Sequence, residues 1–226
     1  MRRALLTLSA FAVAFAFVES AVVAYLRFLY YPDGFTFPLA PMPPDRYAIE
    51  VAREAATLVM LWTVAALAGR DRWERFLFFS IAFGVWDIFY YVWLWVMLGW
   101  PASPLDLDVL FLIPVPWFGP VLAPVAVSAG LIGGSLVLLG LWHRGARLSF
   151  HWYSWTAAIL GGAIVLWTFV RDWRAAIEYR WPAPYPWAAF CAGIAMGLLA
   201  LALETARAIR VLRSRSFPPP ETPERQ

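Results

Sequence analysis

The chain has 226 residues, of which 62% are apolar and 15% are charged, and its formal net charge is +3. Soluble domains hold about 45–50% apolar and about 25% charged residues, so this composition excludes an ordinary soluble enzyme and a disordered chain. All 18 basic residues are arginines at the ends of apolar segments. This distribution is typical of membrane orientation rather than of a nucleic-acid surface. We therefore expect the lipid bilayer as a partner and no nucleic acid.

Six apolar stretches are long enough to cross a bilayer, which takes about 20 helical residues. The first begins like a secretory signal, but its apolar character continues past Glu19 as far as Tyr31, which favours a spanning helix. The predicted spans cover residues 4–31, 46–69, 75–99, 118–142, 152–170 and 185–211. The sequence therefore predicts an all-α, polytopic membrane bundle of six helices. We expect a single unit over residues 1–215 and a disordered, proline-rich cytoplasmic tail over residues 216–226.

The segment between the third and fourth predicted spans is too short to cross the membrane. Ser103 and Pro104 are residue types that start helices, and an apolar run follows over residues 105–113. Four prolines then come close together, at positions 114, 116, 120 and 124. We predict a short interfacial or re-entrant half-helix that ends in a proline hinge.

The arginines also predict the direction of the spans. With the N-terminus inside, twelve arginines lie on the inner side, and six lie on the outer side or in the outer half of the membrane. Cytoplasmic loops are enriched in arginine, so both termini are expected in the cytoplasm. A bacterial inner membrane is the expected location.

Three carboxylates lie inside the predicted spans, namely Glu19, Glu54 and Asp87. An ionisable residue within a membrane is costly, which makes each of them a candidate for a functional site. With a helical rise of about 1.5 Å per residue and a bilayer core of about 30 Å, all three fall about 8–13 Å below the outer face. We therefore predict that they meet in one ligand or metal site.

Five further residues are expected at the rim of this site. They are Glu50, Arg53, Arg27, Asp108 and Tyr91. Glu50 and Tyr91 share helical stripes with the central carboxylates, and the two arginines lie near the outer ends of the same helices. Asp108 either reaches the cluster from the half-helix or is an ordinary helix-start residue. The mixed-charge, aromatic loop over residues 171–181 either covers the cluster as a lid or is an ordinary solvated loop.

The cofactor is unknown from the sequence. Ligation by carboxylates alone would favour a divalent cation such as Mg²⁺, Ca²⁺ or Mn²⁺. The only two histidines, His143 and His151, flank a predicted inner loop far from the carboxylates, so no haem is expected.

Three classes of function stay open at this point. The leading one is an outer-half site that binds or transfers a cation, either a proton or a divalent metal, or that binds a small polar ligand. The second is a structural or assembly subunit of a membrane complex, in which buried charged pairs fasten helices together. The third is an intramembrane enzyme that acts on a lipid with carboxylates as acid–base groups, although no catalytic residue is assigned. A homo-oligomer or a membrane-complex partner is compatible with each class.

Overall fold

The computed structural model describes residues 2–146 and 150–216. Within them lie six long helices: α1 (Arg2–Tyr30), α2 (Pro44–Ala68), α3 (Arg72–Leu98), α4 (Leu122–His143), α5 (Trp152–Val170) and α7 (Trp187–Ser216). All six are long and apolar enough to cross a membrane, which confirms the predicted all-α bundle and makes the chain a multi-pass membrane protein. The predicted spans match these helices to within a few residues. The predicted tail lies outside the described residues except for its first position, and the single-unit assignment stays a prediction.

Helix α3 begins and ends at residues suited to those positions. Asp71 caps its start, since the carboxylate accepts hydrogen bonds from the backbone N–H groups of Trp73 (2.8 Å) and Glu74 (3.0 Å). Gly99 follows its last turn with φ of 64°, a left-handed conformation that glycine adopts without steric cost. The other oxygen of Asp71 accepts a hydrogen bond from the indole of Trp142 at 3.2 Å, which ties α3 to the end of α4.

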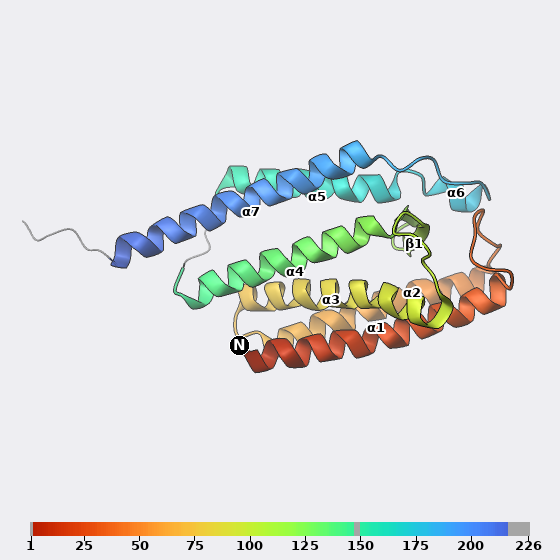
Figure 1. Ribbon diagram of the computed structural model, residues 1–226, viewed down its shortest axis with the longest axis horizontal. Helices are drawn as coiled ribbons and strands as arrows, with labels where there is room; N and C mark the ends of the chain where they lie inside the picture. Colours follow the sequence, from red (N-terminus) through yellow and green to blue (C-terminus); the bar gives the residue numbers. More distant parts are fainter. Residues whose placement is uncertain (1, 147–149, 217–226) are drawn as a thin grey trace, which may run out of the picture.

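Helix α3 occupies the centre of the bundle and packs against α1, α2 and α4. Helices α5 and α7 pair with each other, and α7 attaches this pair to α4 (Figure 1). Helices α1 and α2 touch each other over only a short stretch. The space between α1 and α2 therefore depends on α3 and on the loops for its shape.

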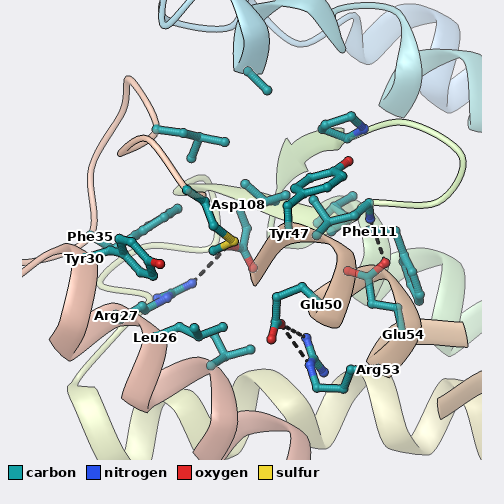
Figure 2. Close-up of a pocket in the computed structure, with 18 of the residues that line it drawn as sticks. Leu26, Arg27, Tyr30, Phe35, Tyr47, Glu50, Arg53, Glu54, Asp108 and Phe111 are labelled. Carbon is teal, nitrogen blue, oxygen red and sulfur yellow. Dashed lines mark hydrogen bonds and ion pairs between the residues drawn. The ribbon is translucent and has the colours of Figure 1, made fainter. Parts of the chain in front are cut away.

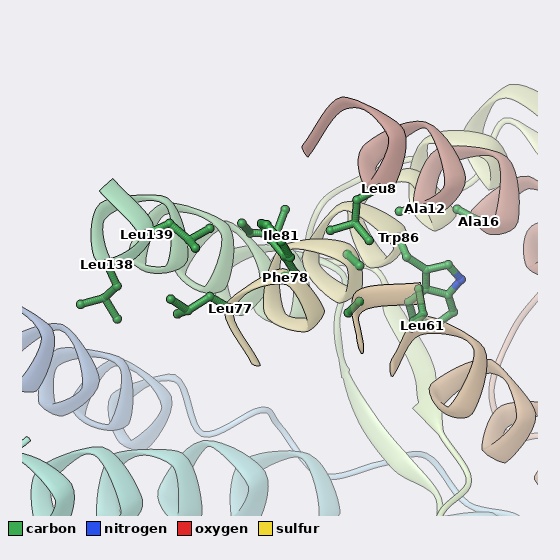
Figure 3. Packing of buried hydrophobic residues seen from close by; sticks show 12 residues of the cluster. Leu8, Ala12, Ala16, Leu61, Leu77, Phe78, Ile81, Trp86, Leu138 and Leu139 are labelled. Carbon is green, nitrogen blue, oxygen red and sulfur yellow. The ribbon is translucent and has the colours of Figure 1, made fainter. Parts of the chain in front are cut away.

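The central core gathers buried side chains from α1, α2, α3 and α4 (Figure 3). Small residues such as Ala12, Ala16 and Gly84 let the helices approach closely, as is usual in membrane bundles. At Gly84 of α3 an added Cβ would lie only 2.8 Å from the carbonyl oxygen of Ser128 on α4. This close approach sets the spacing of α3 and α4 near Asp87.

The segment between α3 and α4 differs from the prediction. Instead of a half-helix it forms an antiparallel hairpin of β1 (Leu107–Phe111) and β2 (Trp117–Pro120). Pro114 and Pro116 lie in the connection, where they have no N–H group to donate to a helix. Val109, Phe111, Trp117 and Phe118 of the two strands are β-branched or aromatic, types that fit a strand. The paired strands satisfy each other's backbone N–H and C=O groups, so the prediction of a half-helix was wrong.

The loops on one side of the bundle gather above α1 and α2. They comprise residues 31–43, the hairpin, the short helix α6 (Arg174–Ile177) and residues 178–186. Figure 1 shows them at the end opposite the N-terminus. We call this side the hairpin end and the opposite side the terminus end.

Candidate functional site

A cavity of about 550 Å³ opens at the hairpin end. Its walls come from α1, α2 and α3, and its cover comes from the hairpin, residues 31–42 and the region of α6 (Figure 2). All eight residues singled out in the sequence line this one cavity: Glu19, Glu54 and Asp87 with Glu50, Arg53, Arg27, Asp108 and Tyr91. The geometry thus brings them together, while their role stays a prediction.

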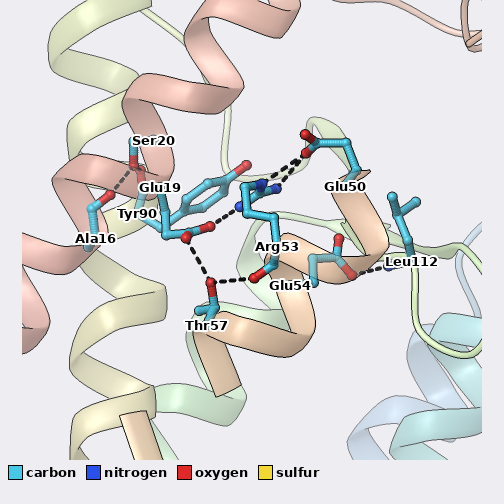
Figure 4. A network of polar contacts seen from close by, with 9 residues as sticks. All are labelled: Ala16, Glu19, Ser20, Glu50, Arg53, Glu54, Thr57, Tyr90 and Leu112. Carbon is cyan, nitrogen blue, oxygen red and sulfur yellow. Dashed lines mark hydrogen bonds and ion pairs between the residues drawn. The ribbon is translucent and has the colours of Figure 1, made fainter. Parts of the chain in front are cut away.

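Arg53 on α2 is shared by two carboxylates. Its guanidinium binds Glu50 on the same helix at 2.9 Å and forms a close ion pair with Glu19 on α1. The hydroxyl of Thr57 donates a hydrogen bond of 2.7 Å to the other oxygen of Glu19. Figure 4 shows Arg53 between the two acids. This network connects α1 with α2, whose backbones touch over only a short stretch.

Arg27 on α1 forms a separate ion pair, with Asp108. Its Nη2 donates a hydrogen bond of 3.0 Å to Oδ1 of Asp108 on β1. Its guanidinium carbon also lies 4.2 Å from the ring centroid of Phe35 and 3.7 Å from that of Trp100, both cation–π distances. Asp108 therefore belongs to a strand rather than to a helix start, and it reaches the cavity from above.

The Arg27–Asp108 pair leaves two buried atoms unsatisfied. Among the described residues, Nη1 of Arg27 and Oδ2 of Asp108 have no hydrogen-bond partner, and Asp108 is only 2% exposed. Burial raises the pKa of the Asp108 carboxyl above its usual value, although the neighbouring Arg27 opposes that rise. Buried polar atoms in proteins normally have partners, so these two atoms, like Nε1 of Trp86 in the same cavity, are exceptions.

Glu54 differs from the other acids of α2. Its Oε2 accepts a hydrogen bond of 2.8 Å from the backbone N–H of Leu112, just beyond β1 (Figures 2 and 4). Within the described parts of the chain it forms no ion pair, because the guanidinium of Arg53 turns to Glu19 and Glu50 instead. Glu54 is thus held in place by the hairpin while its charge lacks a bound counter-ion.

Asp87 lies deepest in the bundle. Ser128 of α4 donates a hydrogen bond of 2.8 Å to its Oδ2 across the close approach at Gly84. Asp87 is 7% exposed and forms no ion pair with any described residue. Its carboxylate therefore adds a second charge without a bound cationic partner to the same cavity.

Aromatic rings form much of the remaining wall, and the sequence analysis missed most of them. Tyr30, Tyr47, Trp86, Tyr90 and Phe111 all line the cavity. The ring centroid of Trp86 lies 6.1 Å from that of Tyr90 and 6.3 Å from that of Phe111. Tyr47 was detectable in principle, because it precedes Glu50 and Glu54 by three and seven residues and so shares their helical stripe.

In the loop that follows α5, some residues line the cavity and others lie outside it. Trp173, Ile177 and Tyr179 line the cavity. Arg180 instead pairs with Asp172 and Glu178 outside it. Trp173 and Tyr179 therefore lie at the cavity, while Arg180 and its two acidic partners lie outside it, and the role of the loop as a lid stays a prediction.

The charges of the lining do not balance. Five carboxylates (Glu19, Glu50, Glu54, Asp87 and Asp108) face two guanidinium groups (Arg27 and Arg53), a formal excess of three negative charges. The carboxylates are nevertheless spread out. Over residues 2–146 and 150–216, no three His, Cys, Asp or Glu side chains lie close enough to hold a metal ion.

Comparisons with family models, with curated proteins and with solved structures find no match to this chain. The site is therefore interpreted from its own geometry and chemistry.

Proposed function

We propose that this multi-pass membrane protein binds a small organic cation in the cavity at its hairpin end. The observation that carries the proposal is the excess of carboxylates over guanidinium groups in one cavity, with both guanidinium groups already bound. Unpaired carboxylates are costly in a low-dielectric site. A bound cation relieves that cost. Glu54 and Asp87 both lack a bound cationic partner, and Glu54 is the more accessible counter-ion because it is only partly buried.

The chemistry of the walls favours an organic cation over a metal ion. A divalent metal needs several oxygen ligands at 2.0–2.6 Å from one point, an arrangement that the described carboxylates do not provide. Aromatic faces such as those of Tyr47, Tyr90 and Trp86 attract ammonium groups through cation–π interactions. A volume of about 550 Å³ also falls within the range of small-molecule sites, about 300–1,000 Å³.

The proposal includes a membrane orientation. Ten arginines of the described residues lie at the terminus end, which supports a cytoplasmic location for both termini. The cavity then lies in the outer half of a bacterial inner membrane. A cation would approach it from the side opposite the cytoplasm.

The test compares three probes of equal size and different charge on the purified full chain. Butylamine, butan-1-ol and butanoate are each added while thermal unfolding is followed by tryptophan fluorescence. A ligand that binds only the folded state raises the unfolding midpoint in proportion to RT ln(1 + [L]/Kd). We expect butylamine to raise the midpoint, butan-1-ol to raise it less, and butanoate to have no effect.

Matched variants separate the cavity from non-specific charge effects. Glu54→Gln keeps the acceptor for Leu112 but removes the charge, and it should abolish the stabilisation by butylamine. Glu178→Gln makes the same change in the exposed loop after α6, outside the cavity, and should leave that stabilisation intact. Equal stabilisation by butylamine and butan-1-ol, or an unaffected Glu54→Gln variant, would mean that the polar network serves only to fasten helices.

A further inference from the structure

We infer that the ligand carries two ammonium groups on one linear chain, with one group bound at Glu54 and the other at Asp108. The inference rests on the proposed function, because it assigns the class of cation that the same cavity takes. It names an alkyl diamine or a longer polyamine rather than a monovalent amine.

Asp108 supplies the independent observation. Asp108 is only 2% exposed, its Oδ1 is bound by Arg27, and the Tyr91 hydroxyl also interacts with the carboxylate, but Oδ2 forms no hydrogen bond of normal geometry with any described residue. Figure 2 shows this carboxylate directed into the cavity. An acceptor in this position needs a donor, and an ammonium N–H supplies one together with a compensating charge. Arg27 binds Oδ1 of Asp108 and lies against two rings, while its own Nη1 has no hydrogen-bond partner among the described residues.

The hairpin places this acceptor away from Glu54. Glu54 is held by the N–H of Leu112, which follows Asp108 by four residues and lies one residue beyond the end of β1. Four residues of extended strand cover about 13 Å, and the irregularity in β1 between Val109 and Phe111 shortens this only in part. Ammonium–carboxylate contacts span about 2.7–2.9 Å, so one ammonium group does not reach both acids.

The lining between the two acids suits the methylene chain of a diamine. Tyr47 projects between Asp108 and Glu54 in Figure 2, and Phe111 lies beside Glu54. Leu110 and Met42 add apolar surface to the same cavity. Aromatic and aliphatic walls between two separated carboxylates match a molecule with apolar carbons between two cationic ends. The excess of three negative charges accommodates two added positive charges without reversing the sign of the site.

Calorimetric titration of the full-length wild type tests the inference with two probes of the same carbon skeleton. Butylamine and 1,4-diaminobutane differ only in the second ammonium group. We expect 1,4-diaminobutane to bind at least ~10-fold more tightly, a difference of about 1.4 kcal/mol. We also expect the affinity to depend on chain length, with 1,2-diaminoethane binding no more tightly than butylamine because it is too short to reach both acids.

The outcomes distinguish the two proposals. Equal affinity for butylamine and 1,4-diaminobutane, with no dependence on chain length, would overturn the diamine inference and leave the cation site standing. Binding of neither amine would overturn both. Glu54→Gln should abolish binding of butylamine and weaken binding of 1,4-diaminobutane, whereas Glu178→Gln should leave both affinities unchanged. Asp108→Asn should reduce the affinity for 1,4-diaminobutane to that for butylamine, and if this variant does not fold, the length series on the wild type decides.

Discussion

Nη2 of Arg27 on α1 donates a hydrogen bond of 3.0 Å to Asp108 on β1, a residue 81 positions further along the chain. This contact holds the hairpin against the transmembrane bundle over the cavity. Both side chains are buried, so the loss of either partner leaves an uncompensated charge in a site of low dielectric.

Asp108→Asn should destabilise the folded protein by about 3–5 kcal/mol, the usual cost of breaking a buried ion pair from one side. The free energy of unfolding in detergent micelles, measured by denaturant titration, provides the check. Asp33→Asn removes the same charge from an exposed position of the loop that precedes α2, and it should change that free energy by less than about 0.5 kcal/mol. Similar losses in the two variants would show that the pair contributes nothing specific.

Arg53→Met should be destabilising for a related reason, because Glu19 and Glu50 both lose their guanidinium partner. We expect a loss of about 3–5 kcal/mol in the free energy of unfolding. The double variant Arg53→Met, Glu19→Met should recover part of this loss, since well-packed apolar residues often replace a buried pair at little cost. Losses that simply add in the double variant would contradict a direct coupling of the two residues.

Gly84→Ala tests the close approach that positions Asp87. The new methyl group would lie 2.8 Å from the backbone oxygen of Ser128, so α3 and α4 must move apart and strain the hydrogen bond between Ser128 and Asp87. Overpacking of this kind costs about 1–3 kcal/mol in the free energy of unfolding. Gly130→Ala on α4 meets no atom within 4 Å and should be neutral or stabilising. If Gly84→Ala changed the free energy of unfolding no more than Gly130→Ala does, the close packing of α3 against α4 would be contradicted.

On acidification, the affinity for 1,4-diaminobutane should begin to fall at a higher pH than it would if the site held an ordinary aspartate. Burial raises the pKa of Asp108, and a protonated carboxyl no longer holds an ammonium group by charge. The groups that face Asp108 are Arg27, which favours its ionised form, and Tyr90, Tyr91 and Asp87 on α3. The ratio of the diamine affinity to the butylamine affinity should therefore decline from a pH above 3.8, the ordinary value for aspartate. A ratio that stays constant down to that pH would contradict the assignment of the second ammonium group to Asp108.

Membrane orientation can be tested with single cysteines in a Cys191→Ser background. Asp33→Cys at the hairpin end should react with a membrane-impermeant maleimide in intact cells. Arg144→Cys lies at the terminus end, after α4, and should react only after the cells are permeabilised. The reverse pattern would place the termini outside and the cavity in the inner half of the membrane.

The helices were predictable because each is a long apolar run with arginine or proline near its ends, and no soluble alternative tolerates such a composition. The convergence of the eight polar residues was also predictable in outline, because a buried acid such as Glu19 or Asp87 needs polar neighbours and their depths coincide. Chain order and helical rise give depth in the membrane but not the distances between helices. The pairing of Arg53 with Glu19 was therefore left open.

The hairpin was not predictable in the same way. Ser103 and Pro104 are typical of a helix start, but the prolines of the connection and the pairing of β1 with β2 decide the structure of this segment. Strand pairing depends on contacts between residues that are distant in sequence, and a single sequence shows these weakly. The position of Trp173 and Tyr179 at the cavity was not predictable for the same reason.

An anomalous-scattering probe bound in an experimental structure tests the central claim most directly. Crystals of the full chain soaked in 4-bromobenzylamine, whose aryl bromide is not displaced by the amine, should show an anomalous bromine peak inside the cavity between α1, α2 and the hairpin, with the ammonium group beside Glu54. The same soak of Glu54→Gln crystals should leave the cavity without that peak. A bromine signal confined to the lipid-facing surface, or one that persists unchanged in the Glu54→Gln crystals, would contradict a cation site in this cavity.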